Sequence, residues 1–189
     1  MDEQPVQLIS ESRTTIPPAP GRSARVDYEY VRQGTCVAWM FVEALGKWRH
    51  VVVTDRRTAV DWAHQMRTLV DHPRFAEAQR ITVVLDNLNT HDIGSFYDAF
   101  APEEARRLIA KLELIFTPKH GSWLNVAEPE LSVMTRQSLG ERPVSQSWVA
   151  KQTAVWATQR NEKQIGIDWQ FTTDNARNKL KRLYPKIET

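Results

Sequence analysis

The chain has 189 residues, of which 41% are hydrophobic and 25% are charged, and its formal net charge at pH 7 is +2. These values fit one soluble globular domain, and no apolar run is long enough for a membrane span or a secretory signal. The single cysteine, Cys36, excludes an internal disulfide and a cysteine-ligated zinc site. It suits a reducing compartment, so we expect a cytoplasmic protein.

Residues 1–25 predict an extended, proline-rich arm, and residues 26–189 a folded core. Residues 16–21 read Ile-Pro-Pro-Ala-Pro-Gly, which neither a helix nor a central strand accommodates. Two β-rich segments follow, over Thr35–Ala44 and Trp48–Thr54. A turn signal lies between them, so they predict an antiparallel hairpin.

The next segments alternate between helix and strand patterns. Thr58–Val70 has apolar residues at helical spacing. Ile81–Leu85 is apolar throughout, as expected of a buried central strand. Pro102 begins a helix, and Leu112–Phe116 reads as another strand. Helices follow Asn125, the last of them near Asp174–Leu183. This order predicts an α/β fold with a mixed sheet and helices on both faces.

Two carboxylates stand where such a fold would present them. Asp86 ends the Ile81–Leu85 strand, and Glu128 lies 42 positions later at an expected helix start. Carboxylates arranged in this way hold divalent cations for phosphodiester chemistry. The alternative is a strand-end turn and an ordinary first helical turn. Glu130 is a weaker alternative ligand, because it points away from Glu128 on a helix.

Three motifs, D-N-L-N-T-H from Asp86, T-P-K-H-G-S-W-L-N from Thr117 and A-E-P-E-L-S from Ala127, carry a resemblance to a known family. The chain resembles the catalytic domain of bacterial insertion-sequence transposases of the mariner superfamily. The resemblance implies a ribonuclease H-like fold and a catalytic, metal-binding triad of Asp2, Asp86 and Glu128. It also implies two Mg²⁺ or Mn²⁺ ions.

The resemblance places Asp2 at the end of an apolar strand, but the chain begins at Met1. We therefore expect a truncated first strand, a poorly mounted Asp2 and little strand-cleaving activity. The alternative for Asp2 is a disordered terminal acid.

Further residues are candidates for supporting the acids or contacting DNA. Asn87, His91 and Asn125 could orient carboxylates or contact phosphate, or could be turn residues. The candidates for DNA contact are Lys119, His120, Trp123, Arg177, Lys179, Lys181 and Arg182. Residues 135–189 hold ten Lys or Arg against five Asp or Glu. That excess fits DNA phosphates as well as it fits a solvated helix surface.

We therefore expect the catalytic domain of an enzyme for metal-dependent DNA cleavage and strand transfer in transposition, with its activity reduced in this chain by the truncated first strand. The expected partners are the element ends, the target DNA, and further copies of the chain or a full-length transposase; the expected location is the bacterial nucleoid. One rival is an inactive remnant that binds only DNA or protein. A second is a stand-alone structure-selective nuclease.

Overall fold

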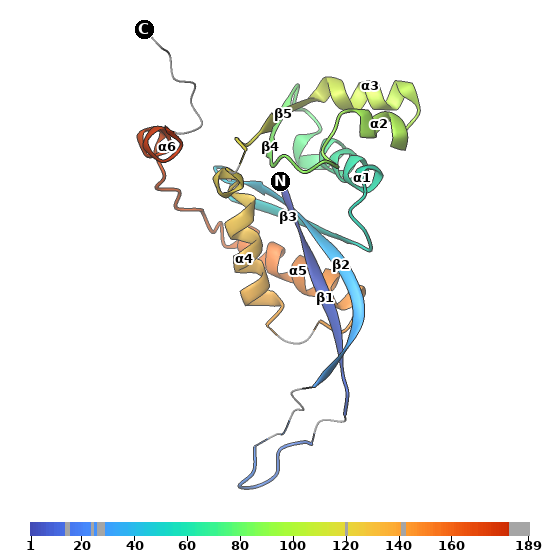
Figure 1. The fold of residues 1–189 in the computed structure, drawn as a ribbon, viewed down its shortest axis with the longest axis vertical. Helices are drawn as coiled ribbons and strands as arrows, with labels where there is room; N and C mark the ends of the chain where they lie inside the picture. The colour runs from blue at the N-terminus through green and yellow to red at the C-terminus, as the bar shows by residue number, and fades with distance from the viewer. Residues whose placement is uncertain (14–15, 24, 26–28, 120, 141–142, 182–189) are drawn as a thin grey trace.

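The computed structural model describes residues 1–13, 16–23, 25, 29–119, 121–140 and 143–181. Within these residues the chain forms five strands in two separate sheets, together with six α-helices (Figure 1). The predicted α/β class is confirmed. The single mixed sheet that we expected is not formed, so the sheet topology does not reproduce a complete ribonuclease H-like arrangement.

The first sheet is antiparallel and has the order β1 (Asp2–Glu11), β2 (Tyr30–Glu43), β3 (Trp48–Thr54). The predicted hairpin is confirmed as β2 and β3, although β2 begins earlier than expected. The predicted arm is wrong over its first part, because Asp2–Glu11 pairs with β2. Pro5 is tolerated there because β1 is an edge strand of this sheet. Figure 1 shows β1 and β2 projecting together beyond the helices.

The second sheet contains two parallel strands, β4 (Ile81–Leu85) and β5 (Leu112–Phe116), which are joined through α2 (Gly94–Ala99) and α3 (Pro102–Lys111). Both strands occupy the predicted residues. However, β4 alternates between buried and exposed side chains. It is therefore covered on one face, and the expectation of a strand buried on both faces is wrong.

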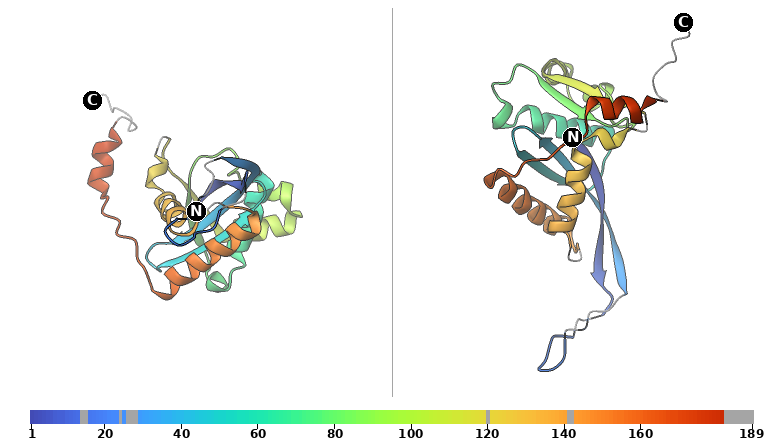
Figure 2. Two further views of the ribbon diagram at one scale, coloured as in Figure 1. Left: turned by 90° about the horizontal axis from the view of Figure 1, so that it is seen from below. Right: turned by 90° about the vertical axis from the view of Figure 1, so that its left-hand side faces the viewer.

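The remaining helices also follow the sequence pattern closely. The first, α1 (Ala59–Val70), is capped by Thr58 and Asp61, which form the predicted capping box. The others are α4 (Ala127–Ser138), α5 (Gln146–Glu162) and α6 (Thr173–Lys179). Figure 2 shows α6 at the periphery, away from the other helices. In the described part of the chain, every helix is too short or too polar to cross a membrane.

Apolar side chains form two cores, one on each face of the first sheet. The core toward α1, α3 and β4 includes Trp39, Phe41, Trp62, Leu85 and Leu108. The core toward α4 and α5 includes Ala38, Met40, Leu131, Met134 and Val149. The first sheet is thus the middle layer of the molecule, and the ends of β1 and β4 meet near α4.

Candidate metal centre

The N-terminal residue is fixed between β4 and α4. The Met1 amino group donates a hydrogen bond of 2.6 Å to the carbonyl of Val84, and the Asn125 side-chain amide donates one of 2.6 Å to the carbonyl of Met1. Met1 is buried in the core. Asp2 follows directly and is the first residue of β1. The expectation of a poorly mounted Asp2 is therefore wrong in this structure.

Asp86 lies just beyond the end of β4 and is held from two directions. One carboxylate oxygen, Oδ1, is 3.2 Å from the Leu88 amide that donates to it and 3.0 Å from Nδ1 of His91. The second ring nitrogen of His91 is 3.3 Å from a carboxylate oxygen of Glu3. The hydrogen bond from His91 lowers the pKa of Asp86 more than partial burial raises it. Asp86 therefore stays ionised to low pH.

His91 is buried between these two carboxylates. Burial alone would lower the pKa of His91, but Asp86 and Glu3 outweigh it and raise the pKa to about 9. At neutral pH the ring is therefore an imidazolium.

Asp2 is electrostatically coupled to Asp86. Burial is the largest cause that raises the pKa of Asp2 to about 6, and the charges of Asp86 and Glu3 raise it further. The amide of Glu3, which donates to Asp2 at 2.8 Å, opposes the shift. A carboxylate that is penalised by burial and by a neighbouring carboxylate gains from a nearby cation.

Glu128 reaches the same region from the first turn of α4. The helix begins at Ala127, so Pro129 falls within the first turn, where its missing N–H costs nothing. Asn125 accepts a bond from the Ala127 amide at 3.2 Å, which ties this helix start to Met1. Glu128 is exposed, and it lines a cleft of about 330 Å³ together with Asp2 and residues on the next turns of α4.

Asp2 thus lies near each of the other two acids. Asp2 and Asp86 interact through their charges, and Asp2 and Glu128 share a cleft. Within the described residues, no group of three or more His, Cys, Asp or Glu side chains has the geometry of a metal site.

Glu130, the weaker alternative ligand, has a different role. Its two carboxylate oxygens contact Nε of Arg49 at 2.8 Å and Nη2 of Arg160 at 3.3 Å. Arg49 and Glu130 are both buried. This ion pair connects β3, α4 and α5, so Glu130 stabilises the helix that carries Glu128 and is not free to bind a metal.

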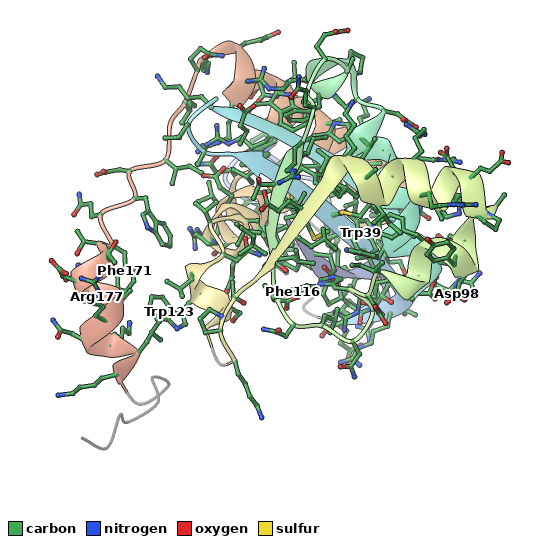
Figure 3. All side chains as sticks on the ribbon, turned by 90° about the horizontal axis from the view of Figure 1, so that it is seen from above. Trp39, Asp98, Phe116, Trp123, Phe171 and Arg177 are labelled. Carbon is green, nitrogen blue, oxygen red and sulfur yellow. The ribbon has the colours of Figure 1, made fainter. Side chains whose placement is uncertain are left out.

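The other candidate residues make contacts with different parts of the chain. Asn87 donates to the carbonyl of Thr117 and so ties the loop after β4 to β5. Lys119 is exposed. Trp123 packs edge-on against Phe171, with ring centroids 4.8 Å apart, and Lys179 lies 4.3 Å above the Trp123 ring. Figure 3 shows Trp123 and Phe171 side by side next to the helix that carries Arg177.

Arg177 pairs with Asp174 at 3.2 Å, and Lys181 is exposed. His120 and Arg182 lie outside the described residues. Trp123 and Lys179 therefore hold the C-terminal segment against the body in this structure. Whether they also contact DNA stays a prediction.

Sequence reasoning missed Glu3 and Arg136. Glu3 follows Asp2, and the two-residue period of a strand puts it on the opposite face, toward His91. The predicted arm over residues 1–25 contains no strand to which that period would apply. Arg136 lines the cleft with Asp2 and Glu128. Its position two turns after Glu128 on α4 could have been inferred from helical spacing.

Comparison with known proteins identifies one family. No curated protein and no solved structure gives a match. One family model, described as DDE superfamily endonuclease, matches residues 1–147, a span that contains Asp2, Asp86 and Glu128. Such a domain implies transposase-like nuclease activity on DNA. Because the match covers more than half of the sequence, this chain belongs to the DDE superfamily of endonucleases.

Proposed function

We propose that the chain is the catalytic domain of an insertion-sequence transposase of the mariner superfamily, with Asp2, Asp86 and Glu128 as its acidic triad. The observation that carries the proposal is the hydrogen bond from the Met1 amino group to Val84, which places the start of β1, with Asp2, beside the end of β4, with Asp86. The family match supports it, because the matched span includes all three acids and the motifs around them.

The donor set fits Mg²⁺ or Mn²⁺. Carboxylate oxygens are the ligands that these ions prefer, and a cation would relieve the charge penalty on Asp2. We propose that Asp2, Asp86 and Glu128 hold two ions, which would neutralise charge on a phosphodiester and make a bound water more acidic. His91 keeps Asp86 ionised, and Asn125 ties the start of α4 to the start of β1.

The proposed reaction has two steps. First, the oxygen of a water molecule bonds to phosphorus at the element end, and the 3′-oxygen leaves as a hydroxyl after it gains a proton. That 3′-hydroxyl then attacks a phosphodiester of target DNA, and a second 3′-oxygen leaves. The partners would be the element ends, the target DNA, and further copies of the chain or a full-length transposase.

A second candidate is a remnant that binds DNA or protein without cutting. The observation that favours it is the pairwise placement of the acids, since the described residues assemble no three-ligand cluster. In this reading the basic side chains contact phosphates, and the acids contribute no chemistry.

The test is a nicking assay on supercoiled plasmid DNA with Mg²⁺, with Mn²⁺ and with EDTA. We expect metal-dependent nicking that Asp86→Asn abolishes. Glu77→Gln, an exposed acid before β4, is the matched control and should nick as the unmodified chain does. DNA binding without nicking under every condition would favour the remnant.

A further inference from the structure

The strands that carry Asp2 and Asp86 are joined by a chain of buried side chains. Glu3 on β1 contacts Nε2 of His91 at 3.3 Å, and Nδ1 of His91 is 3.0 Å from Oδ1 of Asp86. β1 and β4 belong to different sheets, and the described backbone links them by one hydrogen bond, from Met1 to Val84. The side-chain contacts are therefore a major part of the connection.

Packing holds the His91 ring in one orientation. The ring lies against Trp62, with centroids 5.5 Å apart and planes tilted by 31°, and Trp62 in turn meets Phe96 at 5.2 Å. All three residues are buried. Nδ1 of His91 is also 3.2 Å from the backbone carbonyl of Asp86, so it meets the same residue twice.

The Glu3 carboxylate is buried without an aligned hydrogen bond in the described part of the chain. Burying a carboxylate in this way costs stability unless a charge compensates. Nε2 of His91 lies 3.3 Å from this carboxylate. Glu3 and Asp2 project to opposite faces of β1, and both residues line the cleft that Asp2 shares with Glu128.

We infer that Glu3 and His91 are positioning residues that fix the spacing between Asp2 and Asp86. The inference rests on the proposed function, in which both acids bind the same ions. Glu3 anchors the ring from the strand of Asp2, and His91 orients the carboxylate of Asp86. Neither Glu3 nor His91 binds the metal.

The test measures Mn²⁺ affinity by calorimetry on folded Glu3→Ala, Glu3→Gln and His91→Phe variants. Loss of a side chain that orients a ligand weakens metal affinity by about tenfold or more, which is the effect we expect for Glu3→Ala and His91→Phe. Glu3→Gln keeps the length of the side chain and a polar oxygen near His91, so it should restore most of the affinity. Phe96→Leu is the control, because it loosens the packing and leaves the polar contacts in place.

A second readout needs no metal. The Leu88 amide donates to Asp86, so its hydrogen exchange reports whether that carboxylate is held. We expect faster exchange at Leu88, relative to Val83 within β4, in Glu3→Ala and His91→Phe but not in Phe96→Leu.

The inference is overturned if Leu88 exchange is unchanged in both variants, or if Phe96→Leu weakens Mn²⁺ affinity as much as they do. An unmodified chain that binds no Mn²⁺ but shows the expected exchange pattern would contradict the proposed metal site and leave the positioning role supported.

Discussion

A short strand added before Met1 should stabilise the 189-residue chain, and more strongly in acid than in base. The pairing of β1 with β2 ends at Asp2 opposite Met40, yet β2 continues to Glu43. On the other side β4 pairs with β5 alone among the described strands. The groove between β2 and β4 has a volume of about 180 Å³ and a largely apolar lining. Five alternating Val and Thr residues would extend β1 into it.

Much of the expected gain comes from the Met1 amino group. Burial lowers its pKa from 8.0 to about 6. Because an amine with a lowered pKa resists protonation in the folded state, its cost is absent above pH 8 and complete below pH 6. Two units of pKa correspond to roughly 3 kcal/mol. An extension converts this amine into an amide, which can make the same hydrogen bond to Val84 without a charge.

The strand itself adds a smaller term. Each inward Val contributes about 1.5 kcal/mol or more on burial, whereas ordering each residue costs about 1–2 kcal/mol. With the added backbone hydrogen bonds, the net gain is on the order of 1 kcal/mol. This term should not depend on pH, so the two contributions can be separated.

The assay is denaturant unfolding at pH 5.5 and pH 8.5. It compares the unmodified chain, the chain acetylated at Met1, the Val/Thr extension and a Gly/Ser extension of equal length. All three modifications should give the pH-dependent gain, and only Val/Thr should give the constant one. A gain of equal size at both pH values would refute the argument from the buried amine. Equal stability of the Val/Thr and Gly/Ser extensions would refute the argument from strand pairing.

Three further outcomes are expected. Millimolar Mg²⁺ should raise the melting temperature at pH 7.5 but not at pH 5, because Asp2, with a pKa of about 6, is protonated at pH 5. Asp86→Asn should remove the shift in melting temperature. A shift that survives at pH 5 would contradict this metal site. Arg136→Ala should weaken duplex DNA binding and lower its salt dependence by about one phosphate contact. The control, Arg106→Ala on α3, should change neither quantity. Equal effects of the two substitutions would exclude DNA binding at the cleft. Glu130→Gln should destabilise the fold by about 3–5 kcal/mol, because it leaves the buried Arg49 without its charge partner. Glu128→Gln, at an exposed position, should change the stability little. Melting curves of both variants will check this.

Local structure could be predicted from the sequence because its signals are local. The bounds of β3, β4 and β5 and the start of α4 follow from apolar runs, turn residues and the position of Pro129. The pairing of the strands could not be predicted in the same way. A five-residue apolar strand such as β4 fits one sheet or two equally well, and the choice depends on which backbone lies between Val84 and β2.

The candidate site was predictable only in part, for a related reason. Asp2, Asp86 and Glu128 are marked by the motifs around them, and the structure places them near one another in pairs. Their anchoring depends on contacts between residues far apart in the chain. Glu3 meets His91, and Arg49 meets Glu130, only after β1, β3 and α4 have packed. Residue spacing within one helix or strand does not predict contacts between residues that are far apart in the sequence.

The middle strand of the first sheet restricts this fold in a further way. Alternate residues of β2 enter opposite cores, with Val37, Trp39 and Phe41 on one side and Cys36, Ala38 and Met40 on the other. A shift of β2 by one residue against β1 and β3 would turn Trp39 toward α4, into space that fits Ala38, and would leave a void beneath α1. The packing of both cores would then be disrupted together. The alternation of large and small side chains along β2 therefore selects a single register and disfavours slipped pairings as the hairpin forms.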